Sequence, residues 1–204
     1  IVGGFHGNPF AVLGPHEVDG GLAIRAFLPQ AQYVSVQIQD QEHPLTRCHW
    51  DGFFEVVLPG MALGTPYRFR VQTLGGDSVL YEDPYAFGST LSGTDRYLLA
   101  EGTHEQAYEH LGAHLMAVNG VSGVRFLVWA PNARRVSVIG DFNNWDGRRH
   151  PMRFHPGSGL WELFIPGMAQ GSLYKDEIKT SYKDYTVAKA DPVAFASQMR
   201  PDTP

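Results

Sequence analysis

The sequence predicts an all-β protein: two immunoglobulin-like β-sandwich modules in tandem, joined by a short, partly helical linker. Two observations lead to this prediction. Short runs of apolar and β-branched residues alternate with turn residues along the chain, and one set of motifs occurs twice in the same order. A length of 204 residues also leaves room for two modules of about 100 residues each.

The predicted strands are short runs rich in Val, Ile, Phe, Tyr and Leu. In one of them Val34, Val36 and Ile38 would share a face, and this period of two is typical of a sheet with one solvated side. Turn residues such as Pro59–Gly60 separate the runs, which favours sandwiches over an α/β fold. The predicted strands are Leu22–Leu28, Tyr33–Ile38, Phe53–Leu58, Tyr67–Thr73, Arg125–Trp129, Val136–Ile139, Leu160–Ile165 and Leu173–Ile178.

Three motifs of the first half recur in the second. The separation of matched residues grows only from 102 positions, between Pro29 and Pro131, to 108 positions, between Asp83 and Asp191. This conserved order indicates a duplication with small loop insertions, so the two halves should share one fold. The matched segments are Phe27–Val36 with Trp129–Val138, Leu58–Ala62 with Ile165–Ala169, and Asp83–Phe87 with Asp191–Phe195.

The segment between the halves follows a different pattern. Thr103–Gln106 reads Thr-His-Glu-Gln, which is a capping-box pattern, and Gly112 is a plausible helix stop. We therefore predict a short helix around residues 104–111. The predicted division of the chain is an amino-terminal sandwich at 1–93, a linker at 94–118 and a second sandwich at 119–204.

The composition argues against several function classes. The formal net charge is −5, and the arginine pairs at 134–135 and 148–149 are too short to form a basic stripe, so we expect no nucleic-acid or membrane partner. The single cysteine, Cys48, cannot form an internal disulfide, and the chain lacks a run of about 18 apolar residues. We expect a soluble, cytoplasmic protein. Removal of a leader peptide remains an alternative, because the sequence does not begin with Met.

Patterns of catalytic and metal sites are weak. Ile1–Gly4 matches the activated amino terminus of trypsin-like proteases, and Gly76–Ser78 resembles part of their nucleophile motif. A serine without a general base and an orienting carboxylate is not an active nucleophile, so we do not predict a protease. His110 and His114 have the spacing of two metal ligands on one helix face, yet Gly112 between them weakens the helix and no third ligand is spaced nearby. We therefore predict no catalytic residue, no metal site and no cofactor.

The strongest functional signal is the loop Gly140–Gly147, which follows a predicted strand. A tryptophan among Asn, Asp and Gly residues belongs to a loop, and the flat face of the Trp145 indole suits the C–H face of a glucose ring. Asn143 and Asn144 could bond to sugar hydroxyls, and Lys175 could add a charged donor. The alternative is that Trp145 packs back onto its own module and its N–H caps the loop. The other tryptophans are interpreted as structural: Trp50, Trp129 and Trp161.

Several of these segments together resemble one protein family. In the second half they are Arg125–Ala133, Gly140–Gly147 and Tyr174–Lys175, and this half resembles the family-48 carbohydrate-binding module of branching and debranching enzymes. Arg148–Met152 and the first-half segment Asn8–His16 narrow the resemblance to bacterial 1,4-α-glucan (glycogen) branching enzymes. The linker segments Leu98–His104 and Leu111–His114 fit the same family.

The resemblance implies an enzyme that cuts an α-1,4 glucan and re-attaches the segment through an α-1,6 bond, on a catalytic barrel that this sequence does not contain. The expected role is therefore non-catalytic, with Trp145 and Lys175 at sugar-contacting positions. The expected partners are α-1,4-glucan, glycogen or maltooligosaccharide, and the barrel of the same protein. Two alternatives remain: a purely structural scaffold, and a protein-interaction pair of sandwiches without sugar binding.

The sequence departs from the family pattern at three positions. Ala188 stands where a second tryptophan is common, Asp176 where an aromatic residue is usual, and Val193 where tyrosine is usual. A platform with one tryptophan implies weaker sugar binding.

Overall fold

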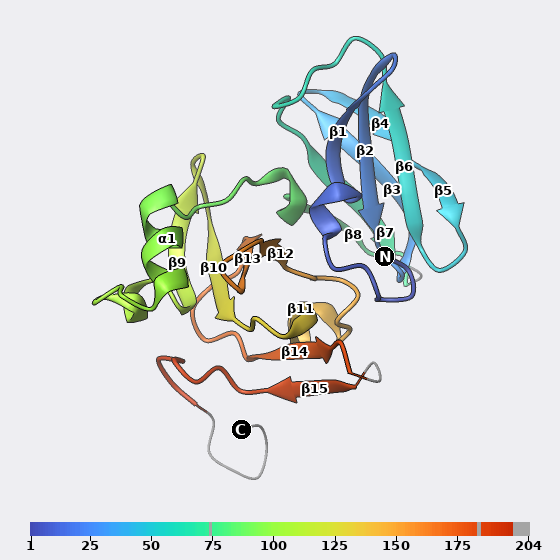
Figure 1. Ribbon diagram of the computed structural model, residues 1–204. Coiled ribbons are helices and arrows are strands. Elements are labelled where there is room, and N and C mark those ends of the chain that lie inside the picture. The colour runs from blue at the N-terminus through green and yellow to red at the C-terminus, as the bar shows by residue number, and fades with distance from the viewer. Residues whose placement is uncertain (74, 183–184, 198–204) are drawn as a thin grey trace. The chain divides into compact units, whose positions relative to one another are not determined.

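The structure is a computed structural model that describes residues 1–73, 75–182 and 185–197. It divides into two compact units: Ile1–Gly4 with Pro9–Gly88 form the first, and Phe5–Asn8 with the residues from Ser89 onward form the second. Four small antiparallel sheets build the two units, and each unit is a β-sandwich (Figure 1). The predicted fold class is confirmed.

The first unit consists of two four-stranded sheets. Its apolar core lies between them and includes Leu22, Ile24, Val34, Phe54 and Phe69. One sheet has the order β1 (Gly14–Val18), β2 (Gly21–Phe27), β6 (Phe53–Leu58), β5 (Thr46–His49); the other has the order β4 (Gln41–Pro44), β3 (Ala31–Ile38), β7 (Arg68–Thr73), β8 (Ser78–Tyr81). Two 3₁₀ turns, η1 (Pro9–Ala11) and η2 (Pro84–Ala86), flank the strands.

The second unit has one four-stranded and one three-stranded sheet. The first has the order β12 (Arg153–His155), β13 (Leu160–Pro166), β10 (Val121–Trp129), β9 (Gly112–Val118). The second has the order β11 (Ala133–Gly140), β14 (Tyr174–Thr180), β15 (Thr186–Lys189). The helix α1 (Gly93–Glu101) and the 3₁₀ turns η3 (Ala107–Glu109) and η4 (Asp141–Asn143) complete the unit.

The helix lies earlier than the sequence analysis placed it. Residues 104–111 contain only the short turn η3, so the prediction of a helix there was wrong. The helix begins instead after Ser92, whose hydroxyl accepts a hydrogen bond from the Asp95 backbone N–H at 3.0 Å, and it ends at Gly102, which has a φ of 71°. Ser92 and Asp95 are themselves a capping pair, so a correct start signal was present in the sequence.

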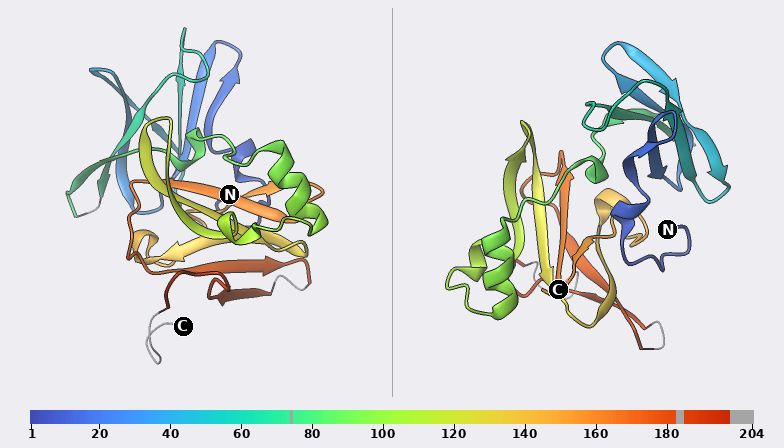
Figure 2. Two further views of the ribbon diagram at one scale, coloured as in Figure 1. Left: turned by 90° about the vertical axis from the view of Figure 1, so that its left-hand side faces the viewer. Right: turned by 45° about the horizontal axis from the view of Figure 1, so that its top comes forward.

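The helix covers the outer face of the β9–β10–β13–β12 sheet (Figure 2). Leu99 of α1 and Leu91 before it pack with Leu127 of β10 and Leu160 of β13. On the other face of β10, the Phe126 ring lies 4.9 Å from the Tyr174 ring of the second sheet. The middle of β10 is therefore buried on both faces, which explains why Phe126, Leu127 and Val128 are apolar in succession rather than alternating with polar residues.

The two units repeat one topology, as the duplicated motifs predicted. The order β1-β2-β6-β5 of the first unit corresponds to β9-β10-β13-β12 of the second, and β3-β7-β8 corresponds to β11-β14-β15. The units differ at one edge. In the first, β4 pairs with β3, whereas in the second the matching edge of β11 carries the isolated bridge between Ser137 and Pro151. The loop Gly140–Gly147 belongs to this altered edge.

The duplication extends to single hydrogen bonds. Asp83 accepts hydrogen bonds from the Tyr67 hydroxyl at 2.6 Å and from the backbone N–H two residues further on at 2.9 Å. Asp191 accepts the same pair, from the Tyr174 hydroxyl at 2.5 Å and from the N–H two residues further on at 2.9 Å. A tyrosine is thus tied to the Asp-Pro turn that closes each unit: Tyr67 directly precedes β7, and Tyr174 is the first residue of β14.

A second repeated detail lies where each first strand begins. Leu13–His16 and Leu111–His114 share the pattern Leu-Gly-x-His, and the glycines have φ values of 86° and 88°. In each segment the histidine Nε2 lies within hydrogen-bond distance of the leucine carbonyl, at 3.1 Å and 2.9 Å. The spacing of His110 and His114 is therefore not helical, because His114 lies on β9.

Candidate functional site

The loop Gly140–Gly147 follows β11 and begins with the turn η4. Asn144 and Trp145 both have left-handed backbone conformations, with φ values of 56° and 58°. A left-handed backbone is uncommon for a residue as large as tryptophan and persists only where the surroundings determine it. Here the Trp145 backbone N–H bonds to the Gly140 carbonyl at 2.9 Å, which closes the loop.

Asn143 supports the loop from inside. Its side chain is fully buried, its Oδ1 accepts from the Gly140 backbone N–H at 3.0 Å, and its Nδ2 donates to the Val138 carbonyl and to His150 Nδ1, both at 2.8 Å. Burial, followed by the charge of Arg149, lowers the pKa of His150 to about 3, so His150 Nδ1 stays an acceptor at neutral pH. The Asn143 amide is therefore engaged within the protein, whereas Asn144 is exposed.

The Trp145 side chain is half-buried. Its Nε1 donates a hydrogen bond to Asp141 Oδ1 at 2.8 Å, at the exposed side of the loop. The polar edge of the indole is thus tied to its own loop, as the alternative interpretation describes, while part of the ring remains open. An indole held in this way offers its apolar surface rather than its N–H to a ligand.

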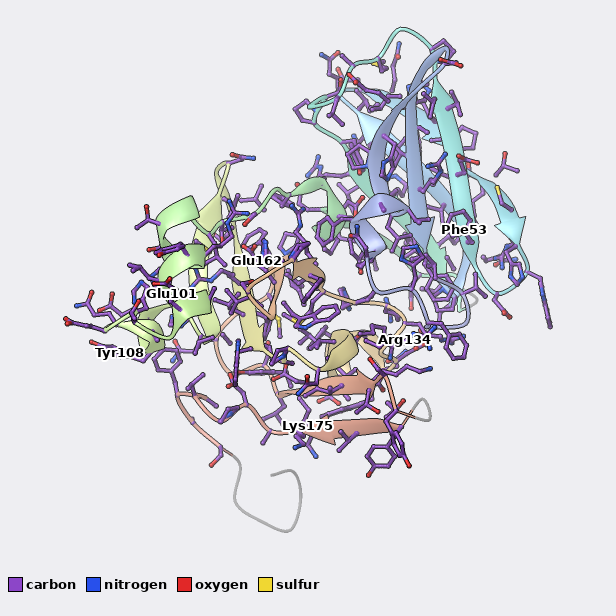
Figure 3. The ribbon with its side chains drawn as sticks, viewed as in Figure 1. Phe53, Glu101, Tyr108, Arg134, Glu162 and Lys175 are labelled. Carbon is purple, nitrogen blue, oxygen red and sulfur yellow. The ribbon has the colours of Figure 1, made fainter. Side chains whose placement is uncertain are left out.

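Lys175 lies on β14, next to the base of this loop. Figure 3 labels Lys175 on this strand. Lys175 pairs in register with Ile139, the residue before Gly140. Because side chains alternate along a strand, Lys175 and Glu177 share the outer face of the sheet. The backbone of Gly147 lies against the Glu177 carboxylate, which would have to move to make room for a side chain at position 147. The end of the loop and Lys175 therefore belong to the same face.

The departures from the family pattern lie on both sides of this sheet. Ala188 of β15 is exposed and pairs with Glu177, so it lies on the outer face with Lys175. Asp176 faces the interior, where it is 3% exposed and its Oδ1 has no hydrogen-bond partner. Burial, followed by the charge of Asp191, raises the pKa of Asp176 to about 7.

The remaining tryptophans differ from one another. Trp161 is buried, at 2% exposure, as expected of a structural residue. Trp50 and Trp129 are 81% and 61% exposed, so their interpretation as structural residues was wrong. Trp129 borders a pocket of about 400 Å³ on the helix-covered sheet, which the sequence analysis missed; Leu99, His104, Leu111 and Leu160 also line this pocket.

Comparison with known proteins finds two family models that match this chain. Residues 110–194 match carbohydrate-binding module 48 (isoamylase N-terminal domain), and residues 1–85 match the N-terminal domain of the α-1,4-glucan branching enzyme GlgB. The whole chain aligns with the 1,4-α-glucan branching enzyme GlgB of Paramagnetospirillum magneticum at 50% identity over 203 residues, and with that of Rhodospirillum rubrum at 49% over 211 residues. The chain belongs to the GlgB family. It corresponds to the amino-terminal region of GlgB, including the CBM48 module.

The chain spans only 27–28% of the length of these two GlgB relatives. Among solved structures, a pullulanase from Anoxybacillus sp. LM18-11 overlaps 88% of this chain and 25% of its own, with 18% identity and a TM-score of 0.32. PulA from Klebsiella oxytoca overlaps 91% of this chain and 20% of its own, with 20% identity and a TM-score of 0.30. TM-scores this low support no conclusion about this chain. None of the helices in the described part of this GlgB region has the length and apolar character needed to cross a membrane.

Proposed function

We propose that this chain is the non-catalytic amino-terminal part of a 1,4-α-glucan branching enzyme, and that its second unit binds α-1,4-glucan, as glycogen or maltooligosaccharide, for the catalytic barrel of the longer protein. The CBM48 match covers the second unit from residue 110 to residue 194. The observation that carries the proposal is Trp145: its left-handed backbone and its tied N–H hold a half-buried indole in the loop that follows β11.

The proposed site uses four residues, of which three contact the sugar and one supports the loop. The open part of the Trp145 ring stacks on the C–H face of a glucose unit, and the Lys175 ammonium donates to sugar oxygens. Asn144, which is exposed, offers an amide to hydroxyl groups. Asn143 acts from within, because its side chain bonds to Gly140 and Val138 and so fixes the loop that carries the ring.

Binding of this kind is weak at a single site. A stacked ring contributes roughly 1–2 kcal/mol beyond its buried area, and each hydrogen bond about 1 kcal/mol. The expected dissociation constant therefore lies between about 1 mM and tens of micromolar. A glucan polymer offers many sites, and tethering to a barrel raises the local concentration of chain ends, so weak binding is sufficient for this role.

Affinity electrophoresis in native gels with and without glycogen tests the proposal. Glycogen should retard the parent chain, and Trp145→Ala should lose most of this retardation because the stacking surface is gone. Lys175→Ala should lose part of it. Trp50→Ala is the matched control, since it removes an exposed tryptophan of the first unit and should migrate like the parent. Equal retardation of the parent and of Trp145→Ala would exclude the Trp145 platform.

A scaffold role is the second candidate, and one observation favours it. Trp129 is 61% exposed on the helix-covered sheet, and an exposed ring beside a pocket is typical of a surface that another domain covers. This role predicts that no variant of the loop or of Lys175 changes migration in glycogen gels. It also predicts that Trp129→Ser leaves the isolated chain stable, because more than half of the residue is already exposed to solvent.

A further inference from the structure

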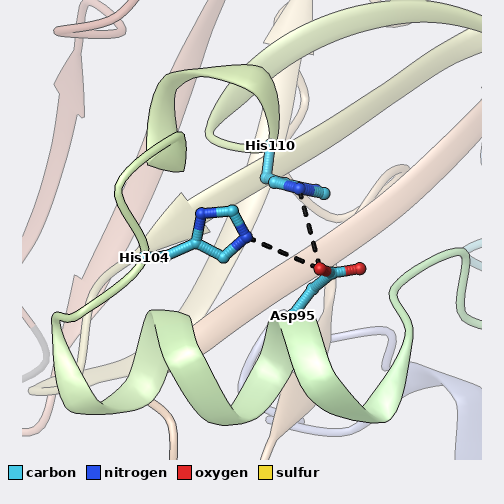
Figure 4. Close-up of side chains that lie close together, drawn as sticks. All are labelled: Asp95, His104 and His110. Atoms are coloured by element: carbon cyan, nitrogen blue, oxygen red, sulfur yellow. Dashed lines mark ion pairs between the residues drawn. The ribbon is translucent and has the colours of Figure 1, made fainter.

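Three side chains that the proposed sugar site does not use meet beside the helix. Asp95 lies in the first turn of α1, His104 in the segment after the helix, and His110 at the end of η3 (Figure 4). Asp95 Oδ1 lies 3.5 Å from His104 Nε2 and 3.9 Å from His110 Nε2. The three potential ligand atoms all lie within 4.8 Å of one another.

We propose that Asp95, His104 and His110 form a zinc site that fastens the segment 102–110 to α1. Two imidazole nitrogens and one carboxylate oxygen suit Zn²⁺, whereas Ca²⁺ and Mg²⁺ prefer oxygen ligands. A tetrahedral ion with bonds of about 2.0–2.1 Å places its ligand atoms roughly 3.3 Å apart. The separations from Asp95 Oδ1 are 3.5 Å and 3.9 Å, and the two imidazole nitrogens lie within 4.8 Å of each other, so the two rings would have to move closer together to bind one ion. Water would complete the coordination.

The surroundings hold two of the ligands in place. Asp95 Oδ2 accepts a hydrogen bond from the Ser92 hydroxyl at 2.6 Å, which leaves Oδ1 facing the imidazoles. Arg125 of β10 donates to the His110 carbonyl at 3.0 Å and to the Glu109 carbonyl at 3.3 Å, so it fixes the backbone that carries His110. Hydrogen bonds of this kind orient metal ligands.

The two imidazoles differ in what zinc would change. His110 Nδ1 is buried and has no hydrogen-bond partner, so it can carry the proton when Nε2 binds the ion. His104 Nδ1 accepts a hydrogen bond from the Gln106 backbone N–H at 3.2 Å. Coordination through Nε2 places a proton on His104 Nδ1 and ends that bond. Zinc should therefore shift the amide resonance of Gln106 as well as the resonances of the ligands.

The spacing of ligands in the sequence does not point to this site. The sequence analysis compared His110 with His114, which lies on β9, where its Nε2 lies 2.9 Å from the Leu111 carbonyl. The turn at Gly102 reverses the chain and brings His104 and His110 back to the first turn of the helix. Only the folded chain places these residues together.

The test is titration of the metal-free 204-residue chain with Zn²⁺ at pH 7.5, followed by calorimetry and by thermal unfolding. We expect one ion per chain and a higher melting temperature with zinc than with EDTA. His104→Gln, His110→Gln and Asp95→Asn should each weaken binding by about 10- to 100-fold or more, because each removes a ligand. His49→Gln is the matched control, since it removes a histidine from a His–Asp pair of the first unit, and it should bind like the parent.

A second measurement remains informative even where a variant is unstable. Co²⁺ bound to the parent by two histidines and one aspartate should give visible absorption bands, and one equivalent of Zn²⁺ should abolish them. The proposal is overturned if the parent binds no zinc at this stoichiometry, or if His49→Gln abolishes binding while the three site variants keep it. Asp95 would then only pair with the histidines. Glycogen retardation does not depend on this site, so the two proposals fail separately.

Discussion

At the scale of single residues, Asp176 is a carboxyl group buried on the core side of its strand. The matching position of the first unit is Phe69, which is buried in the apolar core against Val36, as Asp176 lies against Val138. Burial raises the pKa of Asp176 to about 7. In the unfolded chain this carboxyl titrates near 3.9, so the folded state binds its proton more tightly. Its contribution to stability is therefore greatest at low pH and is lost as the pH rises towards 7.

Asp176→Asn should make the free energy of unfolding less dependent on pH. Relative to the parent, the variant should gain stability between about pH 4 and pH 7 and then hold that gain, with an upper limit of about 4 kcal/mol. Urea unfolding at pH 4 and at pH 8 measures the difference. Asp40→Asn, at an exposed turn, is the control and should change little. An equal gain in the free energy of unfolding at pH 4 and at pH 8 would show that the ionised form of Asp176 does not destabilise the folded state.

The same scale shows where the sequence could not predict the site. Trp145 and Lys175 could be chosen because their residue types suit sugar and their positions matched a known pattern. Asn143 has the same residue type as Asn144, yet one is buried and the other exposed. The difference arises because the Gly140 N–H and the Val138 carbonyl lack strand partners at the end of β11 and take the Asn143 amide instead. That bond depends on the folded loop, not on a local pattern.

At the scale of elements, the prediction succeeded where apolar residues alternate or cluster. All eight predicted runs contain strands, because their apolar residues must face a core. Short edge strands were missed: β4 (Gln41–Pro44) and β5 (Thr46–His49) are largely exposed and carry few apolar residues. The helix was misplaced because α1 is weakly amphipathic, with Leu99 as its buried residue, and its capping residues were the better signal.

Glu162 of β13 attaches the segment before α1 to its sheet. Its carboxylate accepts hydrogen bonds from the Ser89 hydroxyl, the Thr90 backbone N–H and hydroxyl, and His155 Nε2, each at 2.7 Å. Burial alone would raise the pKa of Glu162, but these hydrogen bonds outweigh it and lower the pKa to about 2. The ionised Glu162 carboxylate therefore stabilises the folded state fully above about pH 4.5, and this stabilisation is lost as the pH falls towards 2.

Glu162→Gln should destabilise the second unit by about 2–4 kcal/mol at pH 7, because hydrogen bonds to a charged group are replaced by weaker ones. Chemical denaturation should show that the free energies of unfolding of parent and variant differ less at pH 3 than at pH 7. Glu17→Gln, on a half-exposed edge strand of the first unit, is the control. A gap that widens in acid would contradict the assigned role of the carboxylate.

At the scale of the whole molecule, the duplication separates what both units need from what one unit adds. Both keep the Tyr–Asp pair at the closing turn and the Leu-Gly-x-His start. The second unit alone carries the loop Gly140–Gly147 at the edge where the first unit has β4, and α1 over one sheet. The parts proposed for glucan and for zinc are therefore additions to a shared scaffold. The division at 1–93, 94–118 and 119–204 stays a prediction.

This division of labour predicts which part of the chain binds glucan by itself. The residues from 89 onward contain the loop Gly140–Gly147, Lys175 and the sheets that support them. A fragment of residues 89–204 should therefore show most of the retardation of the full chain in glycogen gels, and a fragment of residues 1–88 should show none. Circular dichroism of each fragment must show β structure for the comparison to hold. Since Phe5–Asn8 groups with the second unit, residues 89–204 should melt somewhat below the full chain. Retardation by the first fragment alone would assign glucan binding to the shared scaffold instead of the added loop.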